Sequence, residues 1–268
     1  MNRMIAGKVE LDIGRPKVAV SITGTTHEEI IEQCKAAKEA PCDILEWRAD
    51  YYLENKDDVD AKLRSDDIQV EVIRILDDIE YETDGMPVIF TIRSKSQGGR
   101  GTLSKEQVYD LNCLAVQAKL ATFVDVELFD DNNMLVREDL LEHVNDIHSF
   151  GGRVIMSYHD FKAMPRREEI VNIVSVMRDL DADIAKIAAF AHNKKDSIEM
   201  IKCCHMLTQD ENDPVIFIAM GKYGLVTRIF GGQYGSVITF ASLGEGTANG
   251  QMNVQTVNRL LDDYYTEK

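Results

Sequence analysis

The chain has 268 residues, of which 44% are hydrophobic, so it is long enough for one α/β barrel or for two average domains with sizeable cores. Its formal net charge of −16 repels nucleic acid and anionic lipid, and we expect neither as a partner. A small anionic substrate remains compatible with this charge, because it responds mainly to the arginines near its binding site.

The five cysteines are odd in number and form no CxxC pair. This pattern favours reduced thiols in a cytoplasmic protein over a disulfide framework or a zinc site. The N-terminal residues 1–14 alternate in polarity too early for a signal peptide. No run of about 18 apolar residues occurs, so we expect no membrane span.

Eight short apolar runs predict β-strands, and their nearly continuous apolar character is typical of strands covered on both faces. Stretches with helical periodicity separate them, and Thr26-His-Glu-Glu29 and Ser104-Lys-Glu-Gln107 fit the capping box at two helix starts. In chain order the runs are Lys17–Thr23, Asp43–Arg48, Pro87–Arg93, Thr122–Leu128, Arg153–His159, Asp183–Ala189, Pro214–Met220 and Ser236–Ser242.

Eight β/α alternations predict a (β/α)8 TIM barrel that forms a single domain over residues 1–268, with the barrel proper at about 16–265. The short β segment Val9–Ile13 precedes the first barrel strand, and we expect it to cap the barrel bottom. The alternative is an open doubly wound sheet. It is disfavoured because the first strand ends in Ser21-Ile-Thr-Gly24, without the Gly-rich turn of that fold.

Catalytic groups of a barrel gather at the C-terminal ends of its strands. Lys186 lies within the apolar sixth strand, where a lysine is costly unless it is paired or neutral. Burial and nearby cations lower a lysine pKa and leave a free amine that attacks ketones. The alternative interpretation is a structural lysine that forms a salt bridge inside the barrel.

His159 ends the fifth strand, next to the strand that carries Lys186. Together the two residues permit a definite chemistry. The amine condenses with a ketone to a protonated imine, which acidifies the adjacent C–H bond. The imidazole removes that proton and then helps a hydroxyl one carbon further along to leave as water. Taken alone, His159 is equally well explained as a histidine packed at a strand end.

Arginines at the strand ends offer recognition of an anionic substrate. Arg93 and Arg228 can each form a charge-assisted pair with a carboxylate, whereas Arg48 can instead pair with Glu46 or another buried carboxylate. A solvated or structural ion pair is the alternative for each. The carboxylates of the fourth strand lack a histidine ligand at suitable spacing, so we predict no metal site.

Motifs in a fixed order on these strands resemble the type I 3-dehydroquinate dehydratase family over roughly residues 16–262. The motifs are Glu46-Trp-Arg48, Phe90-Thr-Ile-Arg93, Val124-Asp-Val-Glu127, Ser157-Tyr-His-Asp160, Ile184-Ala-Lys186, Gly221-Lys-Tyr-Gly-Leu-Val-Thr-Arg228, Phe240-Ala-Ser242 and Gly250-Gln251. The resemblance implies a hydro-lyase that converts 3-dehydroquinate to 3-dehydroshikimate in the shikimate pathway. It also implies no metal or organic cofactor and a homodimer.

The resemblance also implies roles for individual residues. Lys186 matches the Schiff-base lysine and His159 matches the general base and acid. Arg228 matches the residue that holds the substrate carboxylate, and Gln251 matches the glutamine of a mobile loop after strand eight. The other positions that it assigns to the substrate site are Ser21, Glu46, Arg48, Arg93 and Thr247.

Two departures from the family pattern stand out. Gln97 occupies the position of a glutamate that helps to place the histidine. An amide can hold an imidazole by hydrogen bonding, but it cannot raise the histidine pKa by charge. The last loop reads Thr247-Ala-Asn249-Gly-Gln251, with asparagine where the family usually has proline, which predicts a looser loop. We expect an active enzyme with a shifted pH optimum or weaker loop closure.

Two other functions stay open. A class I aldolase also uses a barrel lysine, and glycines after strand seven (Gly221, Gly224, Gly231 and Gly232) leave a phosphate site open by composition. A catalytically retired barrel that only binds ligand is suggested by Gln97. The intact Lys186 and His159 argue against it.

Overall fold

The computed structural model describes residues 4–54, 67–130, 132–209, 214–244 and 250–266. Eight parallel strands form the barrel in the order β10-β3-β4-β5-β6-β7-β8-β9. A bridge between Val215 and Ser236 links β9 to β10, and Val237 N donates to Val215 O at 2.9 Å. The strands are β3 (Lys17–Ile22), β4 (Ile44–Arg48), β5 (Val88–Thr91), β6 (Phe123–Glu127), β7 (Arg153–Asp160), β8 (Ile184–Phe190), β9 (Val215–Met220) and β10 (Ile238–Ala241). The predicted TIM barrel is therefore confirmed.

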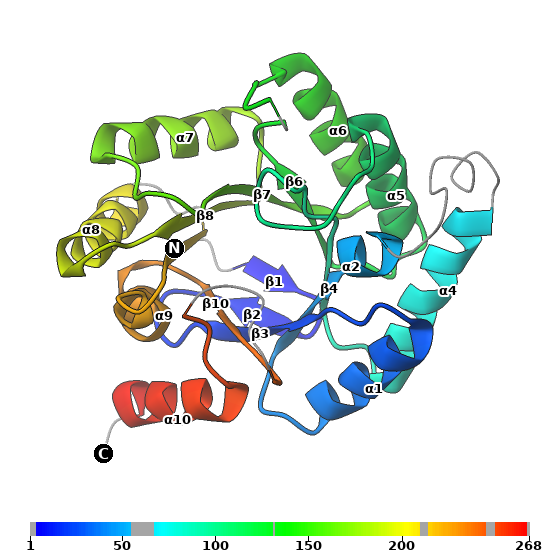
Figure 1. Cartoon of the computed structure of the whole chain (residues 1–268), viewed down its shortest axis with the longest axis horizontal. Helices are drawn as coiled ribbons and strands as arrows, with labels where there is room; N and C mark the ends of the chain where they lie inside the picture. The colour runs from blue at the N-terminus through cyan, green and yellow to red at the C-terminus, as the bar shows by residue number, and fades with distance from the viewer. Residues whose placement is uncertain (1–3, 55–66, 131, 210–213, 245–249, 267–268) are drawn as a thin grey trace.

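Helices surround the strands and bury their apolar stripes against the outer faces of the barrel (Figure 1). Ser104 and Gln107 form the predicted capping box. At the first helix Thr26 caps as predicted, but the Glu29 carboxylate accepts from Thr25 N at 2.7 Å. The helices are α1 (His27–Lys38), α2 (Ala49–Glu54), α4 (Asp67–Glu82), α5 (Lys105–Gln117), α6 (Arg137–Ser149), α7 (Arg167–Asp179), α8 (Lys194–Gln209), α9 (Leu225–Phe230), the 3-10 helix η1 (Gly231–Tyr234) and α10 (Val254–Tyr265).

A two-stranded antiparallel hairpin closes the N-terminal end of the barrel. It consists of β1 (Met4–Ala6) and β2 (Val9–Leu11), and it lies across the centre of the ring of helices in Figure 1. Its buried side chains join one apolar cluster with the inward residues at the start of the barrel strands. That cluster includes Ala6, Val9, Leu11, Ala19, Ile44, Ile89, Phe123, Ile155, Ile184 and Ile216. The predicted cap is thus present, as a hairpin rather than a single segment.

Above this cluster the barrel interior becomes polar, and alternate strands contribute to a common layer, as is usual in this fold. Strands β4, β6, β8 and β10 each place one side chain in this layer around Lys186. The Nζ atom of Lys186 lies 3.6 Å from Glu46, 3.1 Å from Asp125 and 4.6 Å from the Phe240 ring centroid. The fold therefore brings residues far apart in the sequence around one amine.

Candidate active site

One pocket opens at the C-terminal ends of the strands, with Lys186 and His159 among its lining residues. It brings together nine of the ten site residues expected from the sequence; the tenth, Thr247, lies outside the described residues. The nine are Ser21, Glu46, Arg48, Arg93, Gln97, His159, Lys186, Arg228 and Gln251.

Lys186 points into the barrel from β8 and is only 4% exposed. Its ammonium donates to Asp125 Oδ2 at 3.1 Å, and Glu46 Oε1 is the next carboxylate, at 3.6 Å. The Phe240 ring covers it from β10. The salt bridge that was the alternative reading of Lys186 is therefore present, and the same amine also faces the pocket.

Arg93 is bound inside the protein by carboxylates of the neighbouring strand β6. Its guanidinium donates to Asp125 at 2.7 Å, to Glu127 at 2.9 Å and to Ser157 at 2.8 Å. Burial lowers the pKa of Arg93, but the charges of Asp125 and Glu127 outweigh it and raise that pKa. Arg93 therefore enters the site as part of a charged network, and its carboxylate partners come from the protein.

Asp125 receives hydrogen bonds on both oxygens, from Lys186 and Arg93 on Oδ2 and from Ser157 on Oδ1. Burial raises the pKa of its carboxyl, but the positive charges of Arg93 and Lys186 hold that pKa well below its usual value. Asp125 is thus an ionised carboxylate beneath the pocket. From the sequence, Asp125 was considered only as a metal ligand. Asp125 and Glu127 lie two residues apart on the strand next to Arg93, and this spacing could have indicated carboxylate partners for that arginine.

Glu46 and Arg48 lie two residues apart on β4 and face the same side, but they do not pair. Glu46 accepts from Ser21 Oγ at 2.6 Å and from Thr91 Oγ1 at 3.4 Å. Arg48 makes two hydrogen bonds of 2.8 Å to Asp50, a fully buried residue. The expectation that Arg48 would find another buried carboxylate holds in this geometry.

Arg228 is buried, and it forms no ion pair with a described residue. Its guanidinium donates to the carbonyl oxygen of Phe240 at 3.2 Å, while Nε has no hydrogen-bond partner within the described chain. Burial lowers its pKa to about 10. A buried cation with open donors at the pocket wall suits an anionic ligand group.

His159 is held by Gln97 in a fixed orientation. The Gln97 carbonyl oxygen accepts from the backbone N of His159 at 2.9 Å and lies 3.2 Å from Nδ1. An oxygen at this position requires the proton on Nδ1, which leaves the lone pair of a neutral imidazole on Nε2. Burial lowers the pKa of His159 well below its usual value, and the charges of Arg93 and Lys186 lower it further. The imidazole is therefore neutral and can act as a base.

Apolar side chains complete the pocket, and sequence reasoning did not assign them. Phe161 stacks near His159 with the two ring planes 17° apart. Ile218 and Met220 of β9 also line the pocket. They follow the alternation of inward positions on β9, which was readable from the strand itself.

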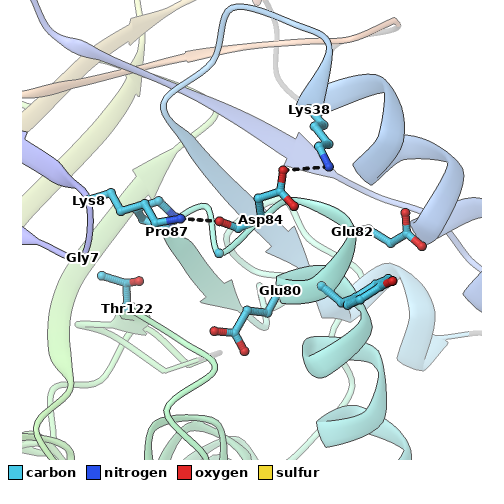
Figure 2. A pocket seen from close by; sticks show the side chains of 10 residues that line it. Gly7, Lys8, Lys38, Glu80, Glu82, Asp84, Pro87 and Thr122 are labelled. Atoms are coloured by element: carbon cyan, nitrogen blue, oxygen red, sulfur yellow. Dashed lines mark hydrogen bonds and ion pairs between the residues drawn. The ribbon is translucent and has the colours of Figure 1, made fainter.

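A second hollow lies at the opposite end of the barrel, between the hairpin turn and the ends of α1 and α4 (Figure 2). Lys8 donates to the backbone oxygen of Asp84, and Lys38 pairs with the Asp84 side chain at 2.8 Å. Because both lysines are already engaged, this hollow presents no free cation from them. Catalytic groups gather at the other face of such barrels.

One of the glycines that left a phosphate site open in the sequence lies away from the pocket. Gly232 packs against Gly14 and Pro16 at the start of β3, so it lies at the closed end of the barrel.

Among the described residues no group of three or more His, Cys, Asp or Glu side chains could hold a metal ion. No helix in the described ranges is long and apolar enough to cross a membrane.

The fold and the pocket define a (β/α)8-barrel protein in which a lysine, a neutral histidine and an arginine without an ion-pair partner among the described residues line one pocket. A family model described as "Type I 3-dehydroquinase" matches residues 18–268. The chain belongs to the type I 3-dehydroquinase family.

Known relatives match along nearly their whole length. A 3-dehydroquinate dehydratase of Clostridium kluyveri is 32% identical over 254 residues, covering 94% of both chains. One from Klebsiella pneumoniae is 31% identical over 264 residues and covers 97% of this chain and 98% of its own. A crystal structure of the type I enzyme from Clostridium difficile with covalently modified comenic acid has a TM-score of 0.86 at 30% identity, with 98% of each chain covered.

Proposed function

We propose that this protein dehydrates 3-dehydroquinate to 3-dehydroshikimate, with Lys186 forming an imine and His159 moving the proton. The observation that carries the proposal is the shared pocket: it is lined by a buried amine, a neutral imidazole of defined tautomer and a guanidinium that pairs with no carboxylate of the described ranges. Membership of the type I 3-dehydroquinase family supports the substrate.

The first step joins Lys186 to the substrate ketone. The ammonium and the ketone give a protonated imine and one water, so the positive charge stays on Nζ. Nucleophilic attack requires the free amine, so one ammonium proton passes to Glu46, 3.6 Å from Nζ, and returns when the hydroxyl of the addition product leaves as water. The imine is an electron sink that acidifies the neighbouring C–H bond.

His159 acts in the second step through Nε2, since Gln97 occupies Nδ1. The imidazole takes the proton from the carbon next to the imine and becomes a cation. The electron pair moves to the imine nitrogen and returns as the hydroxyl one carbon further along leaves. His159 gives its proton to that hydroxyl, so water departs, and a second water frees Lys186.

Substrate orientation falls to the rim of the pocket. Arg228 has open donors for the substrate carboxylate, and Glu46 and Arg48 can meet its hydroxyls from β4. Gln251 lies against β10, where its Nε2 is 3.5 Å from Ala241 O. We assign Gln251, together with Thr247, to the loop that covers bound substrate.

Borohydride trapping tests the imine. With 3-dehydroquinate present, peptide mass spectrometry should find one reduced adduct, on Lys186. His159→Ala should still give the adduct but should stall proton removal, which is seen as loss of solvent exchange at the acidified carbon. An adduct on another lysine, or full turnover by His159→Ala, would reject these assignments.

For the class I aldolase alternative, Gly232 lies at the closed end of the barrel, whereas Gly221 and Gly224 follow the C-terminal end of β9. Assaying a phosphorylated sugar beside 3-dehydroquinate tests this alternative, because an aldolase would split a C–C bond. A retired ligand-binding barrel would bind 3-dehydroquinate without an adduct or turnover, so the same experiment separates it from the enzyme. The proposed substrate is a small molecule, and no nucleic acid partner is proposed.

The homodimer and the cytoplasmic location belong to the proposal as well. Five free cysteines, four of them buried, fit a reducing compartment. Family membership favours the dimer. Light scattering of the purified protein should give twice the 30.2 kDa chain mass, and a mass of one chain would contradict the dimer.

A further inference from the structure

We propose that Asp125 is the permanent counter-ion of the protonated imine and is therefore a further catalytic residue. This inference rests on the proposed function of Lys186 and extends it. Asp125 touches the nitrogen that reacts, but it does not line the pocket, so its task is directed at the nitrogen and not at the substrate.

The geometry fixes the carboxylate against Lys186. Oδ2 lies 3.1 Å from Nζ and also accepts from Arg93 at 2.7 Å, while Ser157 donates to Oδ1 at 2.5 Å. These contacts leave the carboxylate little freedom to turn away. Asp125 and Lys186 lie on β6 and β8, two alternate strands of one barrel layer, so the backbone also holds their separation.

The charge on nitrogen explains why a fixed anion helps. Condensation converts R–NH3⁺ and a ketone into R–NH⁺=C and water, so Nζ carries one positive charge before and after the step. An anion that stabilises the resting ammonium therefore stabilises the iminium without reorganisation. Without it, a buried cation would tend to lose its proton, and a neutral imine draws electrons from the neighbouring carbon much less.

Glu46 is the other carboxylate near Lys186, and its surroundings differ. It lies 3.6 Å from Nζ and is held by the hydroxyls of Ser21 and Thr91, without a guanidinium. Glu46 also lines the pocket and can meet the substrate. Asp125 therefore contacts the reacting nitrogen, whereas Glu46 also faces the substrate in the pocket.

The test measures the protonation of the imine directly. Cyanoborohydride reduces protonated imines selectively, whereas borohydride reduces both forms. With 3-dehydroquinate and wild-type enzyme, both reagents should give the same Lys186 adduct from pH 6 to 9. In Asp125→Asn the cyanoborohydride adduct should fade at a pH about one to three units lower than in wild type, because a neighbouring opposite charge is lost. The borohydride adduct should persist, and kcat should fall with rising pH in parallel.

Two further variants keep the test decisive. Ser157→Ala removes one hydrogen bond from Asp125 but leaves its charge, so it should produce a smaller change in the same direction. Glu127→Gln is the matched control: it removes a carboxylate from Arg93, at 2.9 Å, without touching Lys186. Its two adduct profiles should keep the wild-type pH dependence. Thermal unfolding of each variant shows whether it is folded.

Different results would contradict the counter-ion role of Asp125 and the imine on Lys186. If Asp125→Asn and Ser157→Ala both keep the wild-type pH profile of cyanoborohydride trapping, or if Glu127→Gln changes it as much, then Asp125 only supports Arg93 and the inference fails. If wild-type enzyme yields no Lys186 adduct with either reagent, the imine itself is rejected. Rescue of the profile by Asp125→Glu would support the charge rather than the shape of the side chain.

Discussion

Replacing Arg228 with methionine is expected to make the free protein more stable while weakening its hold on substrate. Arg228 is 2% exposed, and its guanidinium has no carboxylate partner among the described residues and leaves Nε unbonded there. A methionine side chain fills similar space without a charge. The two effects have opposite signs, which separates them from general damage to the fold.

The magnitude follows from the pKa. Burial lowers the pKa of Arg228 from 12.5 to about 10, and each tenfold change in a proton equilibrium corresponds to about 1.4 kcal/mol. The buried charge therefore costs the folded state about 3 kcal/mol. The hydrogen bond to Phe240 O returns about 1 kcal/mol. The net gain in the free energy of unfolding is about 2 kcal/mol, or about 5 °C in the unfolding temperature.

Binding changes in the other direction. A charge-assisted pair with a carboxylate contributes about 3 kcal/mol, so kcat/KM for 3-dehydroquinate should fall about a hundredfold. Thermal unfolding of the ligand-free protein and steady-state kinetics measure the two effects separately. Arg48→Met is the matched control, since it strips the buried Asp50 of its guanidinium and should cost about 3–5 kcal/mol of stability.

One result would refute this reasoning. If Arg228→Met lowered the unfolding temperature as Arg48→Met does, the Arg228 guanidinium would be an anchor of the fold rather than a cation held open for an anion. A hundredfold loss of kcat/KM together with lower stability would then say nothing about the substrate carboxylate.

The remaining predictions concern titrating groups. Gln97→Glu puts a carboxylate 3.2 Å from His159 Nδ1, so the pKa of His159 should rise and the acid limb of kcat/KM should move to higher pH; an unmoved limb would show that residue 97 does not tune the base. Burial lowers the pKa of His143 from 6.5 to about 4, so the unfolded chain binds the proton first and stability should be lost as pH falls from about 6.5 to about 4. Urea unfolding of His143→Leu should show a weaker dependence over that range, and an unchanged one would contradict the burial argument. Lys186→Ala should abolish turnover, which a spectrophotometric assay of the product checks.

The sequence predicted the barrel well because strands covered on both faces carry a dense local signal. The run Pro214–Met220, for example, corresponds to β9 at Val215–Met220. The three-residue strand β1 was not predicted, because so short a segment has too few residues for an alternation to be recognised. At the first helix the Glu29 carboxylate also accepts from Thr25 N, a contact that the capping-box pattern does not include.

Residues of the site were predictable one by one, but their partners were not. Lys186 and His159 stand out because each is polar in an apolar run. The destination of Arg93 depends on the next strand, whose Asp125 and Glu127 lie 32 and 34 residues away in sequence. Arg48 was expected to pair with some buried carboxylate, and the choice of Asp50 required the turn into α2. Pairing across a curved sheet is a property of the fold rather than of any local pattern.

The hairpin at the base of the barrel determines where substrate, product and water can enter and leave. Because Ala6, Val9 and Leu11 pack into the apolar floor, the cavity is closed at the N-terminal end of the barrel. Substrate must enter, and water and product must leave, by the same opening at the C-terminal ends of the strands, where Gln251 lines the pocket. If the opening is closed before the imine is hydrolysed, the water expelled in the reaction stays beside Lys186, where it is needed to release the product.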